Sequence, residues 1–245
     1  MTLDTKAWLV FRDQPWRRFV LFLSFYNEYR ELRVHFYDHS GGIVTLPVDI
    51  HREPDTFQYI MACIVFGRRD CIGFDLTITM NPKMISPITV NDHEYLLLKV
   101  LFSCQGLVGR GTVCYLARRN GEEYIVKDHW VKGNKDAVLN EVKMLEEMEG
   151  VSGVPELVEY WLVEVEKGQP DETQNYRQII HSSTMNMSRT HVRLVLKPQA
   201  RPLHMFRSRK EFVKIIRDIV LGEIATYFGR SLCQLILCYS SAVCG

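Results

Sequence analysis

The stretch that most constrains the fold runs over residues 106–148, where a glycine-rich turn is followed by two strands and a helix. Val113, Tyr115 and Ala117 alternate along the first strand, and the turn signal RRNG leads into a returning strand over 123–130. Two strands joined by such a turn predict a hairpin with one face turned inward.

A helix is predicted directly after this hairpin, over residues 136–148. Its apolar residues recur at helical spacing, and Glu141 lies next to this apolar stripe rather than opposite it. Gly150 and the sequence GVP at 153–155 end the helix.

The glycine-rich turn contains Gly109, Arg110, Gly111 and Thr112. A phosphate needs backbone amides that point at it with no side chain in the way, and glycine allows that close approach. The turn is therefore a candidate phosphate site, although a short pair of glycines is also common in ordinary turns.

Lys127 and Glu141 are the candidate charged residues. Lys127 lies on the same strand face as Ile125, because side chains alternate along a strand. From there it would reach a phosphate as a point charge, and it needs a carboxylate such as Glu141 to hold it. Either residue alone also fits a solvated surface charge, so the prediction depends on their order and spacing together.

In this order and spacing the chain resembles the fungal-type protein kinase family, a divergent branch of the eukaryotic protein kinases. The resemblance spans about residues 16–220 and is carried by the segments WRRFVLFLSF, LRVHFYDHSGG, FDLTITM, GLVGRGT, IVKDHW, GVSGVPELV, RLVLKP and RPLHMF. It implies phosphoryl transfer from ATP to serine or threonine of a protein, with Mg²⁺ as the metal.

By this resemblance the glycine turn is the nucleotide loop, Lys127 is the phosphate lysine and Glu141 is its partner on a helix. The strand and hinge around Leu196 and Pro198 would set backbone groups against the adenine edge. The third glycine of a kinase loop falls at Cys114, where a residue forced to positive φ would cost about 1 kcal/mol.

The residues that carry out the transfer itself are absent from the sequence. A kinase needs a catalytic aspartate in an H-R-D-x-x-x-x-N loop and a metal-binding aspartate in D-F-G. Neither motif occurs in the 245 residues. The nearest fragment, Ile216-Arg217-Asp218, is predicted to lie inside an amphipathic helix over 211–225, so we reject Asp218 as a catalytic residue.

The resemblance stops after Val220. The tail 221–245 is apolar, has almost no charge after Arg230 and carries three cysteines. Our hypothesis is that this tail arises by read-through, frameshift or alternative splicing, which would make the chain a truncated form of a kinase.

Composition excludes several classes. A net charge of +1 gives no strong pull on nucleic acid or membrane. No apolar run approaches the ~18 residues of a spanning helix, and the first residues lack the pattern of a signal peptide. Seven cysteines without a CxxC pair predict reduced thiols in the cytoplasm or nucleus. The scattered histidines, His39 among them, are interpreted as ordinary strand and turn residues rather than ligands.

The predicted fold class is α+β, in three parts. Residues 1–95 are expected to form a mainly antiparallel N-terminal module. Residues 96–200 are expected to form a kinase-like small lobe, an antiparallel sheet plus one helix. Residues 201–245 would hold the first helix of an incomplete large lobe and the aberrant tail.

Inside these parts the pattern predicts further elements. The N-terminal module is expected to contain a helix over 54–66 and a strand over 73–80. The polar, aperiodic segment 167–190 is predicted to be a mobile insertion.

Three interpretations of function remain open from the sequence. The chain is a kinase fragment that binds ATP but does not catalyse transfer, or a pseudokinase-type scaffold that binds an unknown protein partner. The third is an unrelated α+β protein with a chance G-x-G, which would not be stabilised by ATP and Mg²⁺.

Overall fold

The computed structural model describes residues 2–79, 86–104, 106–133, 135–150, 154–177, 188–197, 208–210, 212–214 and 216–217. In chain order the elements are α1 Leu3–Asp13, β1 Phe19–Tyr26, β2 Glu31–Asp38, β3 Gly41–Val44, β4 Val48–Asp49, α2 Pro54–Phe66, the 3₁₀ turn η1 Arg69–Ile72, β5 Ser86–Val90, β6 His93–Ser103, β7 Val113–Arg119, β8 Glu122–Lys132, α3 Lys135–Val138, α4 Asn140–Glu147, β9 Glu156–Leu162, β10 Glu164–Glu166, β11 Gln169–Pro170, the 3₁₀ turn η2 Thr173–Tyr176 and β12 Arg189–Lys197.

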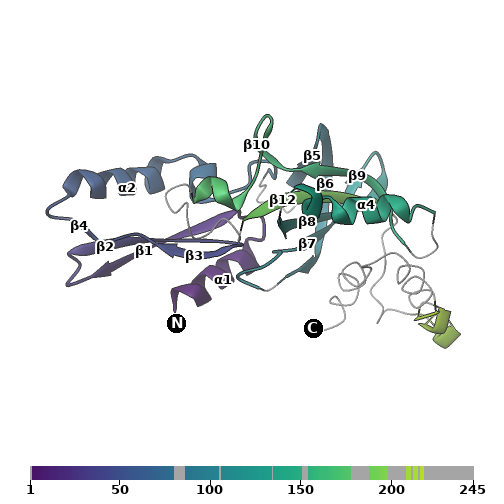
Figure 1. Cartoon of the computed structure of the whole chain (residues 1–245), viewed down its shortest axis with the longest axis horizontal. Helices are drawn as coiled ribbons and strands as arrows, with labels where there is room; N and C mark the ends of the chain where they lie inside the picture. Colours follow the sequence, from purple (N-terminus) through teal and green to yellow (C-terminus); the bar gives the residue numbers. More distant parts are fainter. Residues whose placement is uncertain are drawn as a thin grey trace.

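The fold is α+β with antiparallel sheets, which confirms the predicted class. Figure 1 shows the strands β1 to β4 with α1 and α2 toward one end of the long axis, and the larger sheet with α4 toward the other. None of the helices within the described ranges combines the length and the apolar character that crossing a bilayer requires.

The N-terminal module is built on the pairing of β1 with β2, and β2 also pairs with β3 and β4. Helix α1, which the sequence pattern did not predict, packs on this sheet. Thr2 caps the helix, because its hydroxyl accepts a hydrogen bond from the Thr5 N–H at 3.3 Å. Ala7 and Phe11 are buried from its inner face. Helix α2 has the predicted bounds.

The six-stranded sheet has the order β5-β6-β7-β8-β12-β9. The predicted hairpin is β7 and β8, and Val113, Tyr115 and Ala117 are all buried on one face, as expected. The opposite face is covered by α4, whose Val142 and Leu145 pack into the core beneath it.

Two boundaries differ from the prediction. The division expected between residues 95 and 96 falls inside β6, and β5 pairs with β6, so the six-stranded sheet begins at Ser86. The helix expected over 136–148 is interrupted at Leu139, where α3 ends and α4 begins.

The strand expected over 73–80 is also wrong, since the described part of this segment makes only single bridges, through Phe74 and Ile78. Asp75 explains the difference. Its carboxylate accepts hydrogen bonds from the Thr77 N–H at 2.9 Å and the Thr77 hydroxyl at 2.7 Å. Such local side-chain bonds compete with a strand ladder.

The segment expected to be a mobile insertion over 167–190 is packed in its first part. Residues 169–177 form β11 and η2, and Asp171, Thr173 and Arg177 are buried. Polarity suggested a solvated loop, but the two charged side chains find buried partners in the N-terminal module. Residues 178–187, like Pro198, the tail 221–245 and most of the helix predicted over 211–225, lie outside the described residues.

Candidate functional site

Lys127 and Glu141 form an ion pair in the structure. Lys127 lies on β8 with a side chain that is 2 % exposed, and Glu141 lies in the first turn of α4. The Lys127 Nζ donates to Glu141 Oε1. The glycine-rich turn joins β6 to β7 beside this pair, and the Arg110 Nη2 donates to Glu141 Oε2 at 2.8 Å. The structure therefore brings together three of the residues that the sequence singled out.

The electrostatics of this cluster leave one positive charge in excess. Burial alone would raise the pKa of Glu141, but its interactions with His129, whose Nε2 lies 3.4 Å from Oε2, and with the charge of Lys127 hold it well below its ordinary value. Burial lowers the pKa of His129 to about 4, so His129 is neutral near pH 7. One carboxylate thus faces two cations, Lys127 and Arg110. A desolvated excess of positive charge favours a bound anion.

The backbone of the turn has the geometry that its glycines allow. Gly109 has φ +145°, and a side chain added there would meet no atom within 4 Å. The turn is therefore open at Gly109, where a phosphate could approach the backbone. Gly111 has φ +50°. Cys114, in contrast, lies in β7 with no positive φ, so the strain expected there does not arise.

Leu196 and Thr112 are both buried. Leu196 is buried in the core with Ile125, one residue before the end of β12, which runs between β8 and β9. Thr112 is buried, and its carbonyl accepts a hydrogen bond from the Cys104 N–H at 2.8 Å, closing the base of the loop.

A second set of buried charges was missed by the sequence analysis. Arg193 on β12 is fully buried and bridges two carboxylates, Asp75 at 2.9 Å and Asp128 at 3.2 Å. His191 lies between Asp128, at 2.6 Å, and Asp171, at 3.0 Å. Arg18 completes the set by pairing with Asp75 and Asp171, both at 3.0 Å. We call these six residues the buried charge network.

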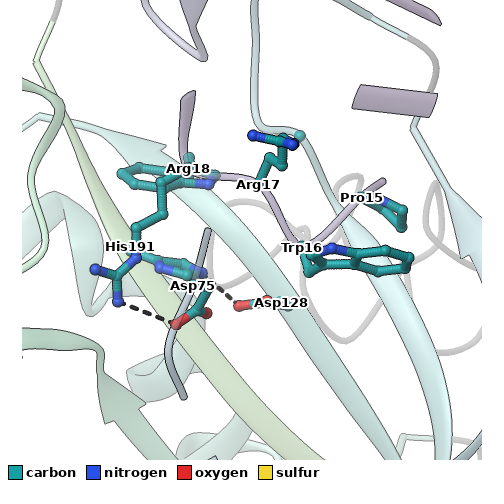
Figure 2. A pocket seen from close by; sticks show the side chains of 9 residues that line it. Pro15, Trp16, Arg17, Arg18, Asp75, Asp128 and His191 are labelled. Atoms are coloured by element: carbon teal, nitrogen blue, oxygen red, sulfur yellow. Dashed lines mark hydrogen bonds and ion pairs between the residues drawn. The ribbon is translucent and has the colours of Figure 1, made fainter. Parts of the chain in front are cut away.

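The network joins the N-terminal module to the six-stranded sheet. Figure 2 shows Arg18 reaching Asp75, and His191 reaching Asp128, beside a small pocket that Trp16 also lines. The signal that could have found this network was the charged Asp128 in the central part of β8, directly after the Lys127 position, because buried charges are nearly always paired.

The network does not suit a metal ion, although ligand atoms of Asp75, Asp128 and His191 lie within 4.8 Å of one another. Although burial alone would lower the pKa of His191, the Asp128 and Asp171 carboxylates raise it to about 9. The three carboxylates of the buried charge network are therefore balanced by three cations, which are Arg18, Arg193 and protonated His191. A divalent cation would have to displace Arg193 from both of its carboxylates.

The chain matches the model of a known protein family. A family model described as fungal protein kinase matches residues 1–228, which is most of the chain. No curated protein and no solved structure matches.

Proposed function

Because the chain belongs to the fungal protein kinase family, we propose that it binds ATP through the glycine-rich turn, Lys127 and Glu141. The observation that carries this proposal is the Glu141 carboxylate, which accepts hydrogen bonds from both Lys127 and Arg110. In kinases the phosphate lysine is held by a glutamate on a helix, and the Lys127–Glu141 pair has this arrangement.

The residues of the cluster fit the phosphates of ATP. Lys127 and Arg110 supply the positive charge, and the turn leaves room at Gly109 for a phosphate to approach the backbone. When bound, ATP would supply a transferable phosphoryl group. The roles of Gly111, Thr112, Leu196 and Pro198 in nucleotide binding rest on the resemblance to kinases.

The described residues of the cluster do not fit a separate site for Mg²⁺. Magnesium prefers carboxylate and water oxygens, and Glu141 is already bound by Lys127, Arg110 and His129. Any Mg²⁺ here would be held through the nucleotide.

We infer that these 245 residues do not transfer the phosphoryl group at a rate above background. Transfer depends on a metal-holding aspartate and a catalytic base, and the sequence contains neither D-F-G nor H-R-D. A radiolabel assay with the purified chain tests this. Strong incorporation that Lys127→Met abolishes would contradict it.

ATP binding is tested by thermal unfolding with and without ATP. We expect ATP to raise the unfolding midpoint of the unaltered chain, because a ligand that binds only the folded state stabilises it. Lys127→Met should remove the effect. The matched control is Lys132→Met, which removes an exposed lysine from the end of the same strand and should leave the ATP effect intact.

A non-catalytic protein-interaction module is the second candidate function. The observation that favours it is that large apolar side chains of the N-terminal module are exposed, with Tyr29 at 77 %, Leu46 at 85 % and Phe66 at 84 %. Exposed apolar surface of this kind often marks a protein-binding site. A defined complex in size-exclusion chromatography with light scattering would support it, and a well-behaved monomer would count against it.

A further inference from the structure

The turn between β2 and β3 lies directly against the glycine loop. The Gly109 N–H donates a hydrogen bond to the carbonyl of His39, on this turn, at 3.0 Å. The imidazole of His39 fills the space beside Gly111. A Cβ added to Gly111 would lie 2.3 Å from His39 Cε1 and 2.4 Å from Nδ1. The loop therefore rests on both the backbone and the ring of one residue from the N-terminal module.

The ring of His39 is itself held between two aromatic side chains. Its centroid lies 4.9 Å from Phe11 on α1 and 5.2 Å from Trp130 on β8. Trp130 also holds the loop, because its backbone N–H donates to the Arg110 carbonyl at 2.7 Å. Gly109, Arg110 and Gly111 are thus all held by His39 or by Trp130, whose ring packs against that of His39.

The turn that carries His39 is anchored through the residues before and after it, Asp38 and Ser40. Asp38 is fully buried and forms an ion pair with Arg177. Its carboxylate also accepts the Ser40 N–H at 2.7 Å. The Ser40 hydroxyl in turn lies 2.9 Å from the hydroxyl of Thr173. Thr173 and Arg177, more than a hundred positions further along the chain, therefore hold this turn in place. A turn held in this way can fix the position of the glycine loop that packs against it.

We propose that His39 is a positioning residue for the nucleotide. It fixes the backbone conformation and the position of the glycine loop, so that the N-terminal module is part of the ATP site. This inference rests on the proposed ATP binding. His39 acts through the loop and not by its charge, since burial and the nearby charge of His191 lower its pKa to about 3 and keep the ring neutral.

The consequence concerns only the phosphate part of the nucleotide. The loop amides other than that of Gly109, which is bonded to His39, would contact phosphates and not the base. Removing the ring should therefore weaken ATP binding and leave adenosine binding nearly unchanged. A role in stability alone would lower the unfolding midpoint without changing the ratio of the two affinities.

The experiment measures ATP and adenosine affinity of the full chain and its variants by calorimetry, with thermal unfolding to confirm that each variant is folded. We expect His39→Ala to weaken ATP binding roughly tenfold, the equivalent of one hydrogen bond to a charged group, and adenosine binding by less than about twofold. His39→Phe keeps a ring between Phe11 and Trp130 and should bind ATP within about twofold of the unaltered chain. His35→Ala, which removes a half-buried histidine from β2, is the matched control and should change neither affinity.

A second pair of variants tests the contact itself. Gly111→Ala places a methyl group against the His39 ring and should weaken ATP binding. In the His39→Ala background the ring is gone, so the added methyl group should cost less than it does alone. Equal losses in both backgrounds would contradict the contact.

The outcomes separate this inference from the proposed function. Absence of ATP binding by the unaltered chain would overturn the proposed function and the inference with it. ATP binding that Lys127→Met removes and His39→Ala leaves unchanged would overturn the inference alone. Selective loss of ATP over adenosine in His39→Ala would support it.

Discussion

Replacing Arg193 by methionine is the substitution for which the structure gives the clearest magnitude. The guanidinium is fully buried and donates to Asp75 at 2.9 Å, to Asp128 at 3.2 Å and to the Thr89 carbonyl at 2.7 Å. Methionine fills much of the same space without charge, so two buried carboxylates lose a shared cation. Removing one partner of a buried ion pair costs about 3–5 kcal/mol.

The lower end of this range applies here. Asp75 keeps Arg18 as a partner, and Asp128 keeps His191. We therefore expect the free energy of unfolding to fall by about 3 kcal/mol, a large share of the total stability of an ordinary domain.

The assay is urea unfolding followed by tryptophan fluorescence, with Arg118→Met as the control. Arg118 lies in the same sheet and pairs with Glu123 at 2.8 Å, but both side chains are well exposed, so its loss should cost about 0–1 kcal/mol. The double variant Arg193→Met/Asp128→Asn should lose less free energy of unfolding than the sum of the losses in the two single variants, because the two residues are directly coupled. Equal stability of the Arg193→Met and Arg118→Met proteins would refute the reasoning.

Three further predictions concern other buried charges. The free energy of unfolding should fall as pH rises from 6.5 through 9, because the pKa of His191 is raised from 6.5 to about 9 and its favourable charge is lost over that interval. The free energy of unfolding should also fall as pH drops from 6.5 toward 3. His39, with a pKa of about 3, stays neutral in the folded state over this range, while the same residue takes up a proton in the unfolded chain. Urea midpoints measured across this pH range check both predictions, and His191→Gln should remove much of the fall in stability above pH 6.5. Glu141→Gln should lower the free energy of unfolding by about 3 kcal/mol, since it leaves the buried Lys127 without its carboxylate; an unchanged urea midpoint would show that the pair contributes little. Arg177→Met should expose the segment 169–177 to limited proteolysis, because it breaks the buried pair with Asp38, and an unaltered cleavage pattern would contradict that account.

The sequence predicted the parts of the fold that depend on local pattern. The bounds of α2, the β7–β8 hairpin and its buried face follow from periodicity and turn residues, which are properties of short windows. The pairing of Lys127 with Glu141 could also be predicted, because a strand and the helix that follows it limit which side chains can meet.

The buried charge network could not be predicted in the same way. Arg193 meets Asp128 across 65 positions and Asp75 across 118. A charged residue in a strand ordinarily faces solvent, and only the assembled structure shows that carboxylates from two distant segments, Asp75 and Asp128, surround Arg193. The same reason applies to His39, which looked like an ordinary turn residue until the fold brought it against Gly111.

The measurement that tests the central claim most directly is a calorimetric titration of ATP into the 245-residue chain, alongside Lys127→Met and Lys132→Met. The account predicts saturable binding at one site in the unaltered chain and in Lys132→Met, and a loss of that binding in Lys127→Met. No binding by the unaltered chain, or binding that Lys127→Met leaves unchanged, would contradict the claim that the Lys127–Glu141 cluster is an ATP site.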